Sequence, residues 1–489
     1  MSQASRWMVV AILAVQACKG SDSSPAPLLT RDELLDPQTC SSCHQDHYAE
    51  WAGSMHAYAS TDPVFLAMNK RGQRETNGQL GTFCVNCHAP MAVREGLTTD
   101  GLNLDQVPQK FKGVTCFFCH TVESVNGAHN APITLSTDLV LRGALTDPFP
   151  TGRTHLAGYS PLVDREQAQA ASTCGSCHDI VTGHGAQIER TFTEWQASAF
   201  STETGTTCGQ CHMPQATSDT VAANVPGAPL RRPHSHLFPA IDKALTTFPD
   251  TDRQTQAVQA LLDTTLQTAL CVEPFAGGSI VSAIIDNVAG GHGFPSGSSQ
   301  DRRVWTEVIA YQGTNVVYQS GVVPAGQAVT ASTDPDLWLM RDCMFDENKS
   351  QVDMFWNAAS FEGNALPALT TFDISSPNFF QTHKQKFFPA AGTTPITPTP
   401  DRITMRVLVR PMGLEVIDDL ISSGDLDASV RAQIGTLVVG NTLEWTQATA
   451  NATYVDRTGT GGTVFCKTDT NLNVAADRFP ALTRADCRP

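Results

Sequence analysis

The sequence predicts a multidomain protein, in which an N-terminal domain of short helices and loops precedes a C-terminal β-sandwich-like domain. Five C-x-x-C-H units fall between residues 38 and 245, in a segment rich in Gly, Thr and Pro that has few long periodic runs. A strongly periodic helix follows this segment. Beyond the helix, apolar residues alternate with a period of two, which is typical of strands. The 489 residues are sufficient for more than one domain.

The N-terminus has the pattern of an export signal, predicted over residues 1–17. An apolar run from Trp7 to Val15 is too short to span a bilayer. Val15-Gln16-Ala17-Cys18 resembles a bacterial lipobox, so we expect cleavage before Cys18, lipidation of this residue, and a flexible lipidated tether over residues 18–37. The alternative is an ordinary signal peptide that is cut nearby. The predicted location is periplasmic or outer-membrane-attached, with exposure at the cell surface left open.

The five C-x-x-C-H units predict covalent haem attachment. Two thiols separated by two residues reach the two vinyl groups of one haem, and the adjacent His lies under the iron as its proximal ligand. Zinc sites do not require that invariant His, and a redox dithiol would occur once. The prediction is five haem c groups in a domain over residues 38–245. The first to fifth units supply the thiols of Cys40 and Cys43, Cys84 and Cys87, Cys116 and Cys119, Cys174 and Cys177, and Cys208 and Cys211, with the proximal ligands His44, His88, His120, His178 and His212.

Further motifs of this segment occur together in one known superfamily. They are Glu50-Trp51-Ala-Gly-Ser54-Met-His56, Gly113-Val-Thr-Cys116, Glu189-Arg-Thr-Phe-Thr-Glu194-Trp195 and Arg232-Pro-His234-Ser-His236-Leu-Phe-Pro. In combination they resemble the multihaem cytochrome superfamily that includes the tetrahaem electron-transfer cytochrome of ammonia oxidisers and hydroxylamine oxidoreductase. Each motif is weak by itself. The resemblance covers the segment from residue 38 to 245.

The resemblance also implies which imidazoles close the irons from the other side. It makes His56 a distal ligand and favours His236 over His234. His292 lies in a Gly-Gly-His-Gly-Phe-Pro segment like the loop by which a β-domain caps a haem in several multihaem cytochromes, and its glycines allow a close approach of the backbone. The complete set of expected distal ligands is His56, His129, His155, His236 and His292; the expected non-ligands are His47, His184 and His383.

Two of these expectations carry explicit alternatives. His129 follows the third unit and is either a distal ligand or a His of a surface loop. Arg302 and Arg303 follow the His292 segment, and either is a candidate to pair with a haem propionate. A salt bridge at the surface is the equal alternative for these two arginines.

The C-terminal elements follow from periodicity. Apolar residues at helical spacing predict a helix over Thr251 to Leu270, within a connecting segment at residues 246–270. Alternating residues predict a strand at 279–286, a hairpin from Val304 to Ser320, and a strand at 403–410. These strands belong to the β-sandwich-like domain that we expect at residues 271–489.

The remaining cysteines are predicted to be structural. Cys271, Cys343, Cys466 and Cys487 suffice for two disulfides. A Cys271–Cys343 bond would tie the helix end to the β-domain, and a bond between the other two would pin the tail. Three connectivities are open, and the sequence does not choose among them.

The net charge of the chain and the number of imidazole ligands on each iron limit the possible functions. The net charge of −16 argues against nucleic-acid binding and favours redox-partner proteins that are basic or neutral. If every iron has two imidazoles, the protein is an electron carrier; this function is favoured over enzymatic activity. The alternative is a reductase or oxidase of a small nitrogen or sulfur compound at one open haem. A binding role for the β-domain is compatible with either, and the oligomeric state is left open.

Overall fold

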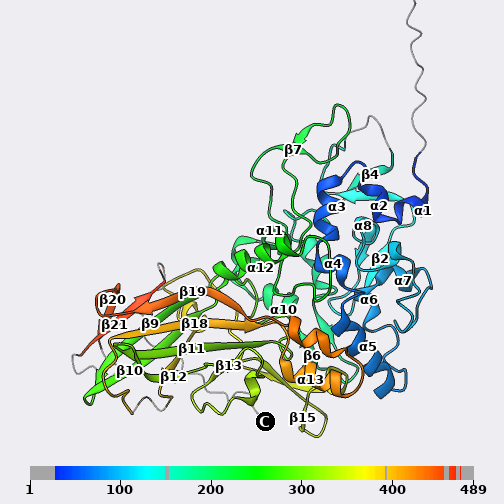
Figure 1. Cartoon of the computed structure of the whole chain (residues 1–489). Helices are drawn as coiled ribbons and strands as arrows, with labels where there is room; N and C mark the ends of the chain where they lie inside the picture. The colour runs from blue at the N-terminus through cyan, green and yellow to red at the C-terminus, as the bar shows by residue number, and fades with distance from the viewer. Residues whose placement is uncertain are drawn as a thin grey trace, which may run out of the picture.

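The computed structural model describes residues 28–148, 154–390, 392, 394–455, 462–469 and 474, and places a helical N-terminal part beside a β-rich C-terminal part (Figure 1). The expected signal peptide and the lipidated Cys18 lie outside the described residues. Within the described ranges, no helix combines the length and apolar character needed to cross a bilayer.

The N-terminal part consists of short helices. They are α1 (Arg31–Leu34), α2 (Pro37–Cys40), α3 (Gln45–Ala52), α4 (Met55–Tyr58), α5 (Pro63–Glu75), α6 (Val85–His88), α7 (Pro90–Arg94), α8 (Cys116–His120), α9 (Ala170–Gly175), α10 (Thr191–Gln196) and α11 (Cys208–His212). α5 is the longest, with 13 residues. Asp62 caps its N-terminus and Pro63 follows at the first turn, where a missing amide proton costs nothing.

Four small two-stranded ladders connect these helices. β1 (Val122–Val125) pairs with β2 (Ile133–Leu135), β3 (Val140–Gly143) with β4 (Leu156–Tyr159), β5 (Ile180–Val181) with β6 (Gln187–Glu189), and β7 (Thr220–Val221) with β8 (Leu230–Arg231). Only β3 and β4 run parallel among these pairs. The main apolar cluster of this part gathers side chains of α5 to α8, with Val85, Met91 and Phe118 almost fully buried.

α12 (Thr251–Thr265) joins the two parts, and it is shorter than the sequence predicts. The expected helix was drawn to Leu270, but the chain extends at Leu266 and enters β9 (Gln267–Phe275). Leu266 and Leu270 are buried in spite of this change. The helical periodicity placed the helix end too late, because apolar side chains of β9 continue the helical pattern by chance. The pairing of β9 with β10 and β21 outweighs the helix propensity of this segment.

The β-rich part contains two main antiparallel sheets. One sheet has the order β17 (His383–Phe388), β10 (Gly278–Asp286), β9, β21 (Thr463–Thr468), β20 (Ala452–Val455). The other has the order β12 (Asn315–Ser320), β11 (Arg303–Gln312), β18 (Arg402–Arg410), β19 (Leu437–Trp445), with β13 (Trp338–Met340) also on β11. A three-stranded sheet consists of β15 (Gln351–Val352), β14 (Asp342–Phe345) and β16 (Ser360–Gly363).

The two main sheets pack face to face, as the alternating strands predict. Val281, Ala283 and Ile285 of β10 share one apolar cluster with Val407 and Val409 of β18. The hairpin expected from Val304 to Ser320 forms as β11 and β12, and its turn contains Gly313 at a φ of 57°. Burial of these inward faces, at about 25 cal/mol per Å² of apolar surface, is the main source of stability in such a sandwich.

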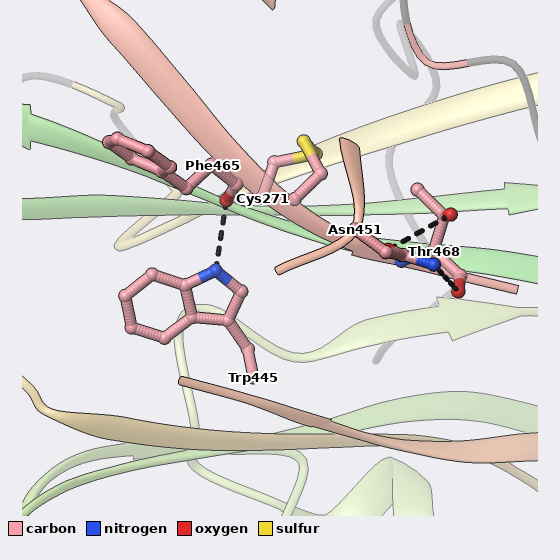
Figure 2. The surroundings of a disulfide bond; sticks show 6 residues. Cys271, Trp445, Asn451, Phe465 and Thr468 are labelled. Atoms are coloured by element: carbon pink, nitrogen blue, oxygen red, sulfur yellow. Dashed lines mark hydrogen bonds between the residues drawn. A yellow bond between two sulfur atoms is a disulfide. The ribbon is translucent and has the colours of Figure 1, made fainter. Parts of the chain in front are cut away.

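A disulfide between Cys271 and Cys466 joins neighbouring strands β9 and β21 (Figure 2). Beside it, the Trp445 indole of the opposite sheet donates to the Phe465 carbonyl at 2.9 Å, and Thr468 and Asn451 exchange hydrogen bonds (Figure 2). The connectivity that the sequence left open is therefore settled for these two cysteines, and it is not Cys271–Cys343. Cys343 is also disulfide-bonded; Cys487 lies outside the described residues.

One helix of the C-terminal part fastens it to the N-terminal part. Ile417 and Leu420 of α13 (Leu414–Ser422) pack with Val64 and Ala67 of α5 in one buried cluster. Arg71 of α5 adds an ion pair to Asp419 at 2.6 Å. The two parts thus share a packed interface, which holds the N-terminal part against a rigid sandwich.

Candidate functional site

The five C-x-x-C-H units line one connected cavity of about 1120 Å³ in the N-terminal part. Each unit forms or adjoins one short helical turn, and two of these turns begin with a capping threonine. Thr115 accepts from the Phe118 amide, and Thr207 forms a capping box with Gln210. All ten thiols of the units are free, so none is consumed by a disulfide. One helical turn brings two thiols and one imidazole to the same side of each unit.

Thiols of different units lie close enough to shift one another's pKa, which indicates how the units are ordered in space. The pairs are Cys40 with Cys116, Cys87 with Cys177, and Cys174 with Cys208. The first unit therefore adjoins the third, and the fourth unit lies between the second and the fifth. The order in space differs from the order along the chain.

Four of the five unit histidines face a second imidazole across the cavity. With metal–nitrogen bonds of about 2 Å, two imidazoles on opposite sides of one metal have ring centres roughly 6 Å apart. The ring centres lie 6.3 to 6.4 Å apart in the pairs His44–His155, His178–His56, His120–His236 and His212–His292. Four of the five expected distal histidines thus lie at the spacing from a unit histidine that two ligands of one metal ion require.

Hydrogen bonds orient these rings. In seven rings Nδ1 contacts a backbone carbonyl, so Nδ1 carries the proton and Nε2 is left as the free lone pair. The carbonyls belong to Ala222 for His44, Ala59 for His88, Arg142 for His120, Pro239 for His212, Leu156 for His155, His234 for His236 and Gly293 for His292. His178 differs, because its Nδ1 contacts the Glu189 carboxylate at 3.3 Å.

Burial keeps most of these imidazoles neutral, which ligation requires. Removal from water is the largest cause that lowers the pKa of His56 to about 3 and the pKa of His212 to about 4, and neighbouring imidazoles contribute to both shifts. For His178 burial also opposes the charged form. The Glu189 carboxylate outweighs burial and raises the pKa of His178 to about 9.

His88 of the second unit has no comparable partner. All 14 histidines of the chain lie within the described residues, and no second imidazole faces His88 at the distance found in the four pairs. The Phe65 ring instead stacks on His88, with ring centres 4.0 Å apart and planes 5° from parallel. The second unit is therefore chemically distinct from the other four.

The structure does not pair His129, the fifth expected distal residue, with an imidazole of any unit. Its Nδ1 contacts the buried Asp179 carboxylate at 2.8 Å, and its side chain is 41% exposed. His47 lies against His236, with ring centres 4.6 Å apart. His47 is also 6.1 Å from His44, but it lies only one helical turn beyond it along the chain. His184 contacts Glu347, and His383 lies in the β-domain beside Asp286.

Two copies of an E-W-x-x-S segment position the surroundings of the units. In the first copy, the Trp51 indole donates to the Val114 carbonyl just before the third unit, and Glu50 accepts from the His236 amide at 2.8 Å. In the second, the Trp195 indole donates to Thr206 just before the fifth unit. Each copy thus joins a unit to the segment that carries its facing imidazole.

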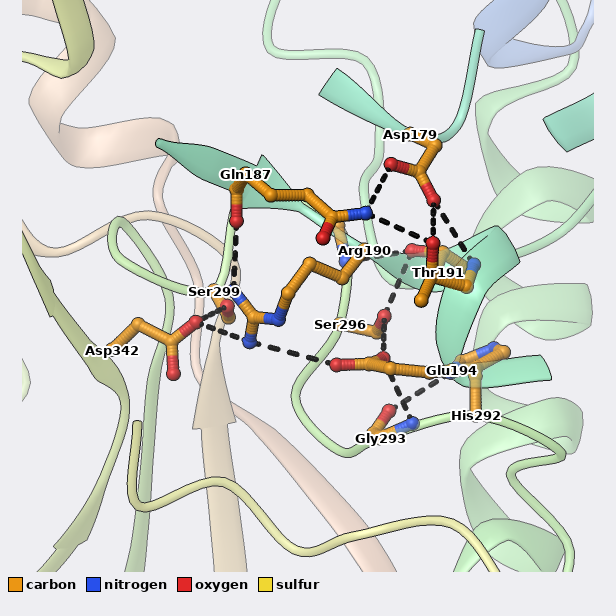
Figure 3. A network of polar contacts seen from close by, with 12 residues as sticks. Asp179, Gln187, Arg190, Thr191, Glu194, His292, Gly293, Ser296, Ser299 and Asp342 are labelled. Atoms are coloured by element: carbon orange, nitrogen blue, oxygen red, sulfur yellow. Dashed lines mark hydrogen bonds and ion pairs between the residues drawn. The ribbon is translucent and has the colours of Figure 1, made fainter. Parts of the chain in front are cut away.

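The second copy fastens the β-domain loop that carries His292 (Figure 3). The Glu194 carboxylate accepts from the Gly293 amide and the Ser296 hydroxyl, each at 3.0 Å. Arg190 lies 3.5 Å from Glu194 and forms an ion pair with Asp342 at 2.7 Å (Figure 3). The carboxylate therefore bridges the N-terminal part and the β-domain directly beside His292.

The two arginines after this loop are engaged within the protein. Arg302 contacts both oxygens of Asp242, at 3.0 and 2.9 Å, and lines the cavity. Arg303 is 1% exposed and pairs with Glu415 at 2.5 Å. Both arginines therefore form salt bridges within the protein, and the Asp242 carboxylate that pairs with Arg302 is 42% exposed.

Sequence reasoning missed the groups that orient the rings. A backbone carbonyl such as that of Ala59 has no sequence signature. Glu189 and Glu194 fall within a motif that marked the superfamily, so a signal existed, but the partners of both carboxylates come from other segments of the chain and depend on the fold.

The donor set fits covalently attached haem. Each unit offers two free thiols, one imidazole with a free Nε2, and a wall of a shared cavity, and four units offer a facing imidazole at the right spacing. The second unit provides the same attachment residues without the facing imidazole.

Comparisons with known proteins agree with this fit. Residues 39–121 match the family described as cytochrome c554 and c-prime. The fold matches the crystal structure of a penta-heme cytochrome c552 from Thermochromatium tepidum with a TM-score of 0.59 and 17% identity, over 85% of this chain and 99% of that chain. No curated protein matches. The findings support a multihaem c-type cytochrome; they do not confirm the likeness to hydroxylamine oxidoreductase.

Proposed function

We propose that this protein is an exported c-type cytochrome that carries five haems and transfers electrons. The observation that carries the proposal is the set of four imidazole pairs, each spaced for one iron and each containing one C-x-x-C-H histidine. Haem supplies a reversible one-electron couple, and two imidazole ligands leave no position for a substrate.

The proposed ligand pairs are the four observed ring pairs. His155 serves the first unit, His236 the third, His56 the fourth and His292 the fifth. The carbonyls at Nδ1 hold each ring in one tautomer and one orientation, which minimises rearrangement when charge changes. His129 is left out of this set because it faces Asp179 and not a unit histidine.

The second unit supports a second candidate function. With no imidazole facing His88, a haem held by Cys84 and Cys87 has a position open to a small exogenous ligand. Apolar side chains such as Phe65, Phe83 and Phe355 line this part of the cavity and favour a small neutral molecule. Reduction or oxidation of a small nitrogen or sulfur compound at this site is compatible with electron transfer through the other four.

Export and anchoring are proposed on the N-terminal pattern. The apolar run that ends at Cys18 supports lipidation in the periplasm or at the outer membrane. The net charge of −16 supports redox partners with a basic or neutral docking face.

The pairing is tested by His155→Ala, with His129→Ala as the matched control. We expect His155→Ala to convert one haem from low-spin to high-spin in the electron paramagnetic resonance spectrum, since the first unit loses its facing imidazole. His129→Ala should leave the spectrum unchanged. If His129→Ala alone creates the new high-spin signal, the proposed pairing is incorrect.

The open position is tested with carbon monoxide on the reduced holoprotein. One equivalent per chain is the expected stoichiometry, and it should persist in His129→Ala. Absence of binding would remove the second candidate function and leave electron transfer alone.

A further inference from the structure

Among the unit histidines and the imidazoles that face them, eight rings have a contact at Nδ1, and only one of these contacts involves a carboxylate. Seven rings contact backbone carbonyls, which are neutral dipoles. His178 of the fourth unit contacts Glu189 Oε1 at 3.3 Å. A carboxylate at Nδ1 raises the basicity of an imidazole ligand far more than a carbonyl does, because it draws the proton toward itself.

The local fold gives Glu189 this position. β5 and β6 form a tight antiparallel pair directly after the fourth unit, and Glu189 at the end of β6 pairs with Ile180. The Phe192 amide then donates to the His178 carbonyl at 3.2 Å, which closes the loop around the ring. The Glu189 side chain is 17% exposed. The His178 side chain is 53% exposed, so it is the carboxylate end of the contact that the backbone pairing of β5 and β6 fixes.

A cation faces the same carboxylate from the β-domain. A Cβ placed on Gly297 would lie 3.2 Å from Arg302 Nη2 and 3.8 Å from Glu189 Oε1, so both groups approach one point. Burial lowers the pKa of Arg302, but the carboxylates of Asp242 and, to a smaller extent, Glu189 raise it above its usual value.

We propose that Glu189 is a positioning residue that makes the haem of the fourth unit the lowest in reduction potential among the four with paired imidazoles. The proposal rests on the proposed function, since it assumes that His178 and His56 hold one iron. A more basic ligand stabilises the oxidised iron, so the potential falls. All six rings of the other three imidazole pairs have a backbone carbonyl at Nδ1 and lack this effect.

The fourth unit lies between the second and the fifth units, so its low potential affects electron transfer to these two neighbours. Its thiols lie close enough to those of the second and the fifth units to shift one another's pKa. An electron that reaches the fourth unit is therefore passed on to a neighbour rather than stored there. One of those neighbours is the second unit, which lacks a facing imidazole.

The test is a redox titration of the holoprotein and of Glu189→Gln, followed by optical and electron paramagnetic resonance spectra. Glu189→Gln keeps the size of the side chain and removes its charge. We expect one low-spin component to titrate at a higher potential while the number of low-spin haems stays unchanged. His56→Ala should remove this same low-spin component, which assigns it to the fourth unit.

Glu347→Gln is the matched control, because Glu347 contacts Nδ1 of the non-ligand His184 at 3.0 Å. It removes an equal charge from a carboxylate at the Nδ1 of a histidine that is not a proposed ligand, although Glu347 is more exposed than Glu189, and it should shift no component. If Glu189→Gln and wild type titrate identically, the inference is overturned and the proposed function stands. If wild type lacks a low-spin component that His56→Ala removes, the proposed function itself fails.

Glu189→Asp provides a second variant in case Glu189→Gln does not accumulate with its haems. Its shorter side chain keeps the charge but withdraws it from Nδ1. The same component should then move in the same direction by a smaller amount, and the absence of any shift would overturn the inference.

Discussion

At the scale of single residues, the orientation of an imidazole depends on the hydrogen-bond partner of its Nδ1. It does not depend on how many residues separate it from a C-x-x-C-H unit. A carbonyl at Nδ1 leaves Nε2 free, and this arrangement recurs in seven rings of the cavity. The sequence identified the unit histidines because thiol spacing restricts them. It also favoured His236 over His234, and the structure brings His236, not His234, to the third unit.

The prediction for His292 belongs to this scale. His292→Ala removes the imidazole that faces His212 at 6.4 Å, so one haem should become five-coordinate and high-spin while the other low-spin haems persist. Electron paramagnetic resonance of the oxidised protein measures the change. An unaltered spectrum would show that the β-domain contributes no ligand.

At the scale of elements, the two E-W-x-x-S segments act as fasteners between a unit and a distant loop. Glu50 holds the amide of His236, and Glu194 holds the amide beside His292. A helix and a loop that are far apart in sequence are brought together by one carboxylate. Burial raises the pKa of Glu194, but the Arg190 guanidinium and the donors from Ser296 and Gly293 favour its charge.

Glu194→Ala should therefore loosen the His292 loop. The loss of hydrogen bonds to a buried charge costs about 1.5–3 kcal/mol, part of which falls on the loop. We expect partial conversion of one haem to high-spin, increasing with temperature, because the loop samples positions away from the fifth unit. Glu123→Ala, which removes an exposed carboxylate on β1, is the control and should show no conversion.

The disulfide gives a prediction that separates stability from haem ligation. Replacement of both Cys271 and Cys466 by Ala removes a link across 195 residues, which should lower the free energy of unfolding by about 2–5 kcal/mol. Thermal unfolding monitored in the far ultraviolet measures this loss. The low-spin haem signals at room temperature should not change, since both strands lie away from the cavity.

The sequence predicted the elements with strong local patterns and failed where tertiary contacts decide. Alternation located β10, β11, β12 and β18, and thiol spacing located the five units. The end of α12 was misplaced because Leu266 and Leu270 fit a helix, although pairing with β10 and β21 makes a strand. His129 was drawn as a ligand by its nearness to the third unit along the chain. Its contact with Asp179 depends on a fold that spacing does not reveal.

At the scale of the whole molecule, a stable sandwich supports an N-terminal part whose own apolar cluster surrounds only one portion of the large cavity. α13 packs on α5, and the His292 loop closes the cavity from the sandwich side. Large apolar haem groups would fill the cavity lined by all five units. The N-terminal part is thus expected to fold only with its haems attached, whereas the sandwich has a continuous core independent of them.

The most direct test of the account is a haem count by pyridine haemochrome combined with quantitative electron paramagnetic resonance on the oxidised, purified protein. The account predicts five haems per chain, of which four are low-spin with paired imidazoles and one, at the second unit, is high-spin. Fewer than five haems, or more than one high-spin haem, would contradict the proposed ligand pairs. Five low-spin haems would show that the second unit has a ligand from another residue and is closed.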